Sequence, residues 1–430
     1  MKKVLAFFFA LIMVLSMFGC AASQEETPVD TTPDTTPLIV WEDDNFPYPK
    51  MNNHLTWDDI EAFPLKSADM TIQEMRELCV AFLNFTKTVV YVPNDYLEFE
   101  KNNNGARDEM VKGQIYGGVP YIGGGGCGNV YRLMDYINPE TGVLDMEYIK
   151  TRPNLFGNHC SSCTYWAWGR VISSVEHAYT ANITHSNGYL RIGPYTYDDA
   201  FNFSSTNTTD MIVAQNGMDV MFESYAQLHL ADGLVNYHSG GGHVIMVTSE
   251  PTIVYTSAGK IDPANSYLTI TDQHQGWIEY TTEDGDVCQL KANVDKKYTF
   301  LSLYENAYLP FSFAEFLGTK GVDETQCSIN IEGECVDQFD LFNAKVTSNF
   351  GISDIYLSLY NASGREVYRL VTRATEAGTK SLSLAKNATS SFSWGDLESL
   401  SGEYTAKVSA QLSTGERPEL YSGKVNIQQN

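Results

Sequence analysis

The sequence predicts a mixed α+β fold, and three observations lead to this prediction. Thr71 and Glu74 form a capping box ahead of apolar residues at helical spacing, which predicts a helix that begins there. A second helix is expected over residues 160–177, and strands are expected over residues 243–248 and 267–273. In the last quarter of the chain, short alternating runs separated by Gly, Asn and Ser turns predict further strands.

The N-terminus has the composition of a signal peptide for export. Lys2 and Lys3 precede an apolar stretch over residues 4–17, which is too short to span a bilayer as a mature helix. The glycine directly before Cys20 resembles the lipobox of bacterial lipoproteins, in which this cysteine is lipidated and begins the mature chain. Residues 1–20 are therefore interpreted as a lipoprotein signal peptide, and we expect an extracytoplasmic protein anchored to the cell membrane by lipid. Plain secretion is the alternative, and it also exports the protein.

The segment that follows has the composition of a linker. Residues 21–45 are rich in Thr, Pro and Asp and lack apolar periodicity. Such a segment forms an extended, solvated tether rather than a packed element. The rest of the chain is divided into a first domain over residues 46–322, which opens with a helical preface, and a second domain over residues 325–430.

The second domain is predicted to be an Ig-like β-sandwich. Apolar and polar residues alternate over residues 355–359 and 404–412, as they do in strands with one buried face. Cys327 and Cys335 are close enough in sequence to form a disulfide in an exported protein. No catalytic cluster is present in this domain, so it is interpreted as a spacer or binding module.

The charge of the chain excludes one class of partner. It carries 53 acidic and 28 basic residues, for a formal net charge of −25. A protein this negative is repelled by phosphate backbones, and no basic stripe is present to offset the repulsion. Nucleic acid is therefore not an expected partner, and the same argument excludes electrostatic docking on anionic surfaces.

Two cysteines stand at the start of the second predicted helix. A thiol at a helix N-terminus has a lowered pKa, because the helix dipole and free N–H groups favour the thiolate. Cys160 and Cys163 are both placed to benefit from this effect. A zinc site requires four ligands and the chain has no second Cys-x-x-Cys motif, so no metal is expected. A redox dithiol or a Cys160–Cys163 disulfide remains an alternative.

A histidine and an orienting group follow on two predicted strands. His243 follows a run of three glycines and begins a strand, which places it at a cleft edge as a candidate general base. Asp272 and His274 lie on one face of the next strand because side chains alternate with a period of two. Either residue is a candidate to orient the imidazole. A nucleophile, a base and an orienting group in this order follow the logic of papain-like hydrolases.

The stretch HCSSCTYWAW, together with GVPYIGG upstream and GHVIMV downstream, resembles the NlpC-type cell-wall endopeptidases. In that family a cysteine opens the helix, a Pro-Tyr segment lines the substrate cleft, and a His-Val strand supplies the base. The resemblance implies that Cys160 is the nucleophile and His243 the base. It also implies that Tyr121 and Trp166 contact the substrate, with packing of the helix as the alternative role of Trp166.

The same stretch is similar to the related CHAP amidase-peptidases, whose helix begins Cys-Thr-aromatic-aromatic. On that register the nucleophile is Cys163. His159 stands where NlpC domains carry Asp, and Asp272 and His274 stand where CHAP domains carry Glu and Asn. The similarity covers residues 113–277, and the Pro-Tyr lead-in favours the NlpC register.

Both families hydrolyse amide bonds in bacterial cell-wall peptides. The resemblance implies a papain-like cysteine hydrolase core within residues 46–322, in which a helix bearing the cysteine packs on an antiparallel sheet bearing the histidine. The expected activity is that of a cysteine peptidase or amidase acting on peptidoglycan stem peptides, without a metal or organic cofactor. The alternative is a catalytically inactive surface lipoprotein that uses the same fold and the sandwich for binding or adhesion.

Overall fold

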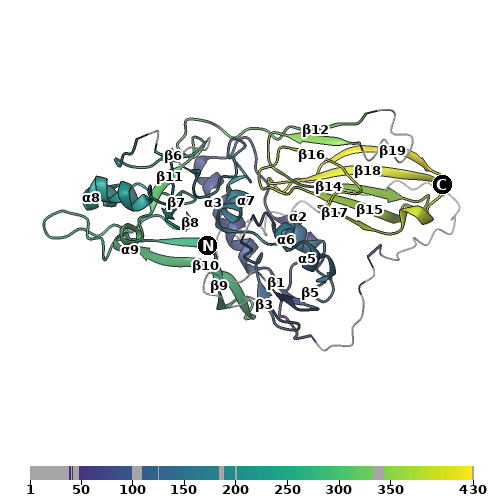
Figure 1. Cartoon of the computed structure of the whole chain (residues 1–430), viewed down its shortest axis with the longest axis horizontal. Coiled ribbons are helices and arrows are strands. Elements are labelled where there is room, and N and C mark those ends of the chain that lie inside the picture. The colour runs from purple at the N-terminus through teal and green to yellow at the C-terminus, as the bar shows by residue number, and fades with distance from the viewer. Residues whose placement is uncertain are drawn as a thin grey trace, which may run out of the picture. The chain divides into compact units, whose positions relative to one another are not determined.

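The computed structural model describes residues 38–39, 41, 48–98, 109–123, 125–183, 188–198, 201–332 and 343–428 (Figure 1). The predicted signal peptide with Cys20, nearly all of the predicted linker, and Cys335 lie outside the described residues. The Cys327–Cys335 disulfide therefore stays a prediction. Among the helices of the described part, none has the length and apolar character needed to cross a membrane.

The described part of the chain is a mixed α+β structure with several sheets and few helices, which confirms the predicted class at this level. The elements up to residue 312 are α2 (Trp57–Ala62), α3 (Ile72–Thr88), β1 (Val90–Pro93), β2 (Leu97–Glu98), β3 (Glu109–Met110), β4 (Tyr116–Gly117), α4 (Val130–Met134), β5 (Val143–Leu144), α5 (Glu147–Thr151), α6 (Pro153–Phe156), α7 (Cys160–Trp168), β6 (Leu190–Arg191), α8 (Thr209–Tyr225), β7 (Gly233–His238), β8 (Gly241–Val247), β9 (Tyr267–Thr281), β10 (Val287–Thr299), α9 (Phe300–Glu305) and β11 (Leu309–Ser312).

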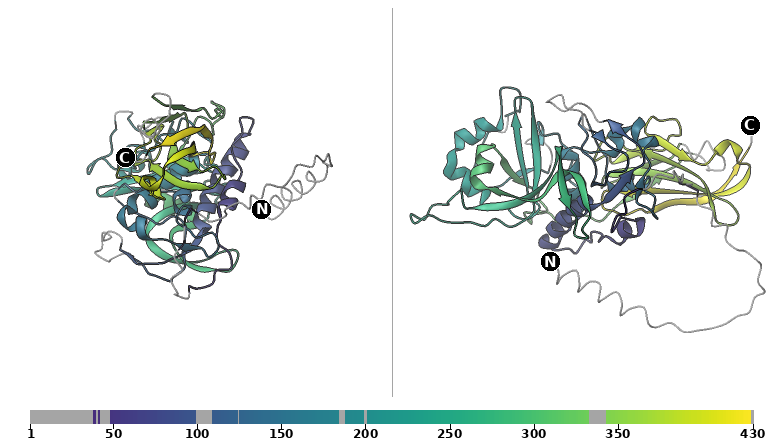
Figure 2. Two further views of the ribbon diagram at one scale, coloured as in Figure 1. Left: turned by 90° about the vertical axis from the view of Figure 1, so that its right-hand side faces the viewer. Right: turned by 90° about the horizontal axis from the view of Figure 1, so that it is seen from below.

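A nine-stranded sheet organises this part of the molecule, in the order β5-β1-β4-β10-β9-β8-β7-β11-β6. Strands β7 to β10 are antiparallel neighbours, and β9 and β10 form a long hairpin (Figures 1 and 2). Helix α7 contacts β8, β9 and α3. The predicted strands over residues 243–248 and 267–273 correspond to β8 and β9, and β9 continues to Thr281.

The predicted N-terminal helix is present as α3, and its capping box is formed as expected. The Thr71 side chain accepts the backbone N–H of Glu74, and the Glu74 carboxylate accepts the backbone N–H of Thr71. The preface is not purely helical, however, which corrects the sequence interpretation. A β-branched and aromatic run follows α3 and forms β1, because such residues favour strands. Strand β1 pairs with β4 and so belongs to the large sheet.

Helix α7 is shorter than the predicted 160–177 helix, because it ends at Trp168. Gly169 caps its C-terminus. The carbonyl of Gly169 accepts a hydrogen bond from the Ser413 hydroxyl at 2.7 Å. This hydroxyl takes the place of the backbone N–H that would donate to Gly169 if the helix continued. The short helix places the two cysteines in its first turns and leaves the chain beyond it to form loops.

The C-terminal elements form two sheets, in the orders β12-β13-β16 and β17-β15-β14-β18-β19. Their bounds are β12 (Cys327–Asn330), β13 (Lys345–Ser348), β14 (Ile352–Tyr360), β15 (Glu366–Arg373), β16 (Ser381–Ser383), β17 (Ser391–Trp394), the 3₁₀ helix η2 (Leu397–Ser399), β18 (Gly402–Leu412) and β19 (Glu419–Ile427). The two predicted alternating segments lie on β14 and β18, which pair antiparallel. Apolar residues of both sheets share one hydrophobic core.

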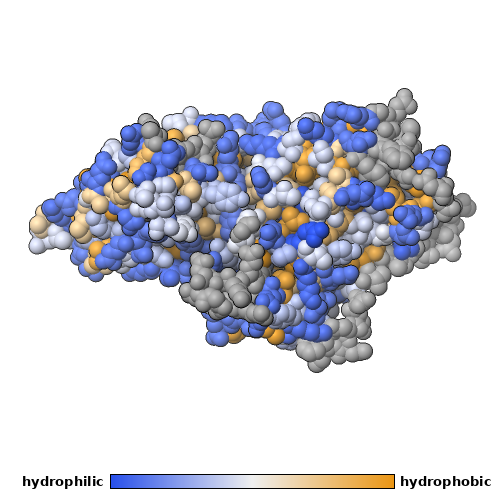
Figure 3. Space-filling model, viewed as in Figure 1, coloured by the Kyte–Doolittle hydropathy of each residue, from blue (hydrophilic) through white to orange (hydrophobic). Residues whose placement is uncertain are grey.

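A buried ionic network joins these sheets to the first part of the chain. Arg132 donates to Asp354 at 3.2 Å, and Arg373 donates to Asp354 at 3.0 Å and to Asp135 at 2.8 Å. All four side chains are essentially inaccessible to solvent. Charges buried this deeply require their partners, so the contact between the two parts is specific. Outside the core, hydrophilic residues cover most of the face drawn in Figure 3.

Candidate active site

The start of α7 is shaped by close backbone approach between two loops. A Cβ atom added at Gly157 would lie 1.9 Å from the Ile122 side chain, so this position admits only glycine. The carbonyl of Asn158 accepts the N–H of Ile122 at 2.8 Å, and its own N–H donates to Pro120 at 3.0 Å. This pairing holds Tyr121 beside the first turn of α7.

Cys160 is the first residue of α7 and is nearly buried, with 8% of the residue exposed. Burial alone raises the pKa of its thiol. The neighbouring side chains of His159 and His243, together with the charge of His243 and the N–H of Val244, outweigh burial and lower this pKa to about 6. Cys160 is therefore a thiolate at neutral pH, which is the nucleophilic form.

His243 lies on β8 and is oriented by a carboxylate on the neighbouring strand. Its Nε2 donates to Asp272 Oδ2 at 2.9 Å, which leaves Nδ1 for Cys160. The side chain is one-quarter exposed, whereas that of Asp272 is 3% exposed. Burial alone lowers the pKa of His243, but its hydrogen bonds to Asp272 and Cys160 raise that pKa to about 10. At neutral pH the pair is thus a thiolate and an imidazolium.

Asp272 is itself held by a third strand. Its Oδ1 accepts the backbone N–H of Asn293 at 2.9 Å and the Asn293 side-chain amide at 3.0 Å. Burial raises the pKa of Asp272, but the hydrogen bond and charge of His243 and the Asn293 N–H lower it overall. The carboxylate is therefore ionised and fixed in place. Asn293 is a site residue that the sequence interpretation missed.

Of the two candidate orienting groups, the structure places Asp272, and not His274, in a hydrogen bond with the His243 ring. The ring of His274 accepts the N–H of Gly276 at 3.0 Å through Nδ1, within strand β9. Burial lowers the pKa of His274. His274 therefore lies near the site but does not hold the His243 ring.

Of the two candidate nucleophiles, the structure places Cys160 beside His243 and Cys163 beside Lys87. Cys163 lies one turn further along α7, where it is buried and accepts a hydrogen bond from Lys87 Nζ at 3.0 Å. Burial raises the pKa of its thiol. The same ammonium donates to the side chain of Gln273, which in turn donates to the Val119 carbonyl. Cys163 is thus a member of a buried polar cluster beneath the site.

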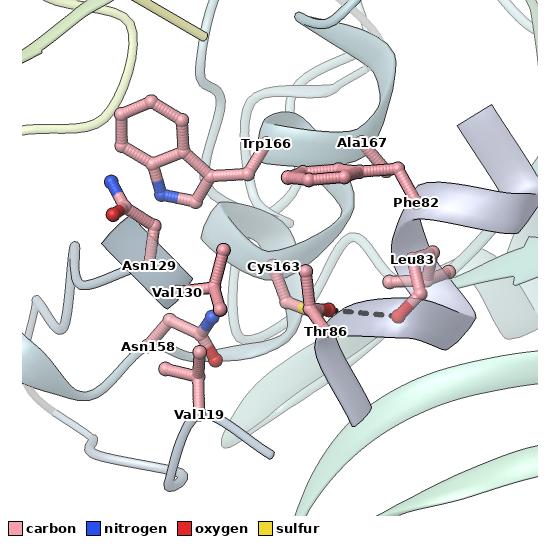
Figure 4. Close-up of a pocket in the computed structure, with 10 residues that line it drawn as sticks. All are labelled: Phe82, Leu83, Thr86, Val119, Asn129, Val130, Asn158, Cys163, Trp166 and Ala167. Atoms are coloured by element: carbon pink, nitrogen blue, oxygen red, sulfur yellow. Dashed lines mark hydrogen bonds between the residues drawn. The ribbon is translucent and has the colours of Figure 1, made fainter. Parts of the chain in front are cut away.

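Trp166 occupies a packing position, which does not support its expected contact with substrate. It is 3% exposed, and its indole N–H donates to the Cys127 carbonyl at 3.3 Å. Figure 4 shows Trp166 and Cys163 on the wall of a small interior cavity between α7 and α3. Trp166 therefore stabilises the interior behind the nucleophile.

Tyr121 is the predicted substrate residue that the structure does bring to the site. It is partly exposed, and burial together with the negative charge of Cys160 raises the pKa of its phenol. A hydrogen bond with Gln275, on the same strand as Asp272, acts in the opposite direction. The phenol thus lies between the nucleophile and β9.

His159 is the residue whose importance the sequence interpretation missed. It is the N-cap of α7, and its Nδ1 accepts the N–H of Ser162 at 3.3 Å. The sequence does show a histidine directly before Cys160. However, the capping role of His159 depends on the orientation of its ring, and only the fold defines that orientation.

The site has the parts of a thiol–imidazole–carboxylate triad. Among the residues that the structure describes, no group of three or more His, Cys, Asp and Glu side chains is arranged to hold a metal ion. No protein-family model matches the sequence, and no relative is found among curated proteins. The geometry of the site is therefore the basis for assigning a function.

Proposed function

We propose that this protein is an exported, membrane-tethered cysteine hydrolase that cleaves amide bonds in peptidoglycan stem peptides or similar cell-wall peptides. The observation that carries the proposal is the alignment of Cys160, His243 and Asp272 across α7, β8 and β9. A thiolate beside an imidazolium that a buried carboxylate orients is the arrangement that acyl transfer requires.

The first half of the reaction forms a thioester. The Cys160 thiolate attacks the amide carbonyl carbon, and a C–S bond forms while the carbonyl oxygen takes up negative charge. The free backbone N–H groups at the start of α7 are suited to hold this oxygen. When the C–N bond breaks, the His243 imidazolium gives its proton to the departing amine.

The second half restores the enzyme. Neutral His243 takes a proton from water as that water attacks the thioester carbonyl carbon. The C–S bond breaks, the acid product leaves, and Cys160 is again a thiolate beside the His243 imidazolium. Asp272 accepts from Nε2 in both protonation states of the ring, so Nδ1 faces the sulfur throughout the cycle.

The choice of substrate rests on the resemblance to NlpC-type and CHAP domains. Two further parts of the NlpC pattern lie close to the Cys160 thiol. They are the Pro-Tyr segment, with Tyr121, and the His-Val strand, with His243. With that resemblance, we assign the first part of the chain to the papain-like class and the C-terminal sheets to an Ig-like sandwich. The lipid anchor at Cys20 is part of the same proposal.

The test is digestion of purified peptidoglycan with residues 21–430, followed by mass spectrometry of the released fragments. We expect new amino and carboxyl termini at one type of peptide bond, and no release by the Cys160→Ala variant. Iodoacetamide should abolish the release, whereas EDTA should not. If Cys160→Ala still releases fragments, the assigned nucleophile is wrong. If the wild-type protein releases none although its Cys160 reacts with iodoacetamide, the assigned substrate is wrong.

A further inference from the structure

His159 stands directly before the nucleophile and lies within the site. It is 7% exposed, and its backbone N–H and side chain form a reciprocal capping box with Ser162. The ring centroid lies 5.5 Å from that of His177 and 5.5 Å from that of Tyr179. The ring is therefore held on one side by the helix and on the other by aromatic neighbours.

The hydrogen bonds of the ring define its tautomer. A backbone N–H can only donate, so the Nδ1 atom that receives the Ser162 N–H at 3.3 Å must carry a lone pair. The proton of the neutral ring then resides on Nε2. The Ser161 hydroxyl, which lies 3.1 Å from the same Nδ1 and 3.3 Å from His177 Nε2, is compatible with this arrangement.

Within the described part of the chain, the Nε2–H group that results is buried and meets no acceptor at ordinary hydrogen-bond geometry. The ring nevertheless lies close enough to the Cys160 thiol to help lower its pKa, against the effect of burial. A buried donor without an acceptor is rare in folded proteins, and beside a nucleophile it indicates an acceptor that forms only during the reaction.

We propose that His159 is a further catalytic residue, whose Nε2–H donates to the oxyanion of the tetrahedral intermediate at the N-terminus of α7. This inference rests on the proposed acyl transfer at Cys160. In this tautomer His159 has no free lone pair directed at the thiol, so it cannot serve as the base, and that role stays with His243.

Two isosteric variants separate the two functions of the ring. In His159→Asn the amide oxygen replaces Nδ1 as the helix cap, but the donor at the Nε2 position is lost. In His159→Gln the longer amide places an N–H near the Nε2 position, but the cap is lost. His229→Asn, at an exposed histidine paired with Glu250, is the matched control.

The measurement compares two reactions of Cys160 at pH 8 that need no knowledge of the substrate. Acylation by p-nitrophenyl acetate passes through an oxyanion, whereas alkylation by iodoacetamide does not. We expect His159→Asn to slow acylation about 10²-fold or more, as for loss of one oxyanion donor, and to change alkylation only a few-fold. His159→Gln should recover part of the acylation rate while unfolding at a lower temperature, and the control should match wild type.

Equal effects of His159→Asn on the two reactions would overturn the inference, as would an acylation rate close to that of wild type. Failure of the proposed function gives a different result. If peptidoglycan is not cleaved but acylation is selectively lost in His159→Asn, then the substrate is wrong and the role of His159 stands. If peptidoglycan is cleaved but the ratio of acylation to alkylation is the same in His159→Asn as in wild type, then the proposed function stands and only the role of His159 is wrong.

Discussion

His243 Nε2 and Asp272 Oδ2 are joined by a 2.9 Å hydrogen bond between neighbouring strands. This bond selects which ring nitrogen faces the nucleophile, because only Nδ1 is left for Cys160. It also couples the charge of the imidazolium to a carboxylate that Asn293 holds from the next strand. The site therefore depends on the pairing of β8, β9 and β10.

Asp272→Asn should lower the rate of peptidoglycan cleavage by about 10²–10⁴-fold, because a neutral amide neither stabilises the imidazolium charge nor holds the neutral ring in the productive tautomer. The fold should be retained, since the amide remains a partner for Asn293. The pKa of the Cys160 thiol should rise as its cationic neighbour weakens. The measurements are the cleavage rate and the pH dependence of alkylation by iodoacetamide. A rate within a few-fold of wild type would remove Asp272 from the triad.

Cys163→Ala should leave cleavage intact but destabilise the protein. The substitution removes the sulfur that accepts from Lys87 at 3.0 Å and leaves a buried ammonium with fewer acceptors. The expected loss is about 1–3 kcal/mol in the free energy of unfolding, measured by denaturant titration. The double variant Lys87→Met with Cys163→Ala should recover part of this loss. Inactivity of Cys163→Ala in a folded protein would restore Cys163 as the candidate nucleophile.

The pH dependence follows from the ion pair. The pKa of Cys160 is lowered to about 6, so alkylation by iodoacetamide should rise through about pH 6 and then reach a plateau. Cleavage also needs a proton on His243, whose pKa is raised to about 10, so cleavage should fall again above that value. Stopped-flow alkylation and initial cleavage rates across this range provide the test. An alkylation midpoint near the ordinary thiol value of 9.0 would show that no such ion pair exists.

Asp354→Asn should destabilise the first part of the chain and the C-terminal sheets together. Asp354 is the shared acceptor of Arg132 and Arg373, and breaking a buried pair costs about 3–5 kcal/mol because a charge is left without its partner. Denaturant unfolding followed by tryptophan fluorescence should show one transition at a lower midpoint. Glu403→Gln, in an exposed pair with Lys424, should leave the midpoint near that of wild type. Two separate transitions in the wild-type protein would show that the parts unfold independently.

Local sequence patterns predicted those helices and strands whose position depends on neighbouring residues in the chain. The capping box at Thr71 defines where α3 begins, and alternation predicted β14 and β18. The end of α7 was not predictable, because the hydroxyl that replaces its next donor belongs to Ser413, far away in the sequence. The β-branched and aromatic run of β1 is a local signal for a strand, but its partner β4, about 25 residues later, was not predictable from that run.

The sequence by itself determined the chemistry available at the site: two thiols at a helix start, a histidine at the start of a strand, and two candidate orienting groups on one strand face. Only the tertiary structure decided among them. Cys160 meets His243 while Cys163 meets Lys87, and Asp272 rather than His274 holds the imidazole. The physical reason is that the pKa of a thiol and the orientation of a ring depend on neighbours from other strands and helices. Periodicity places residues on a common face, but it does not specify which partner lies across from them.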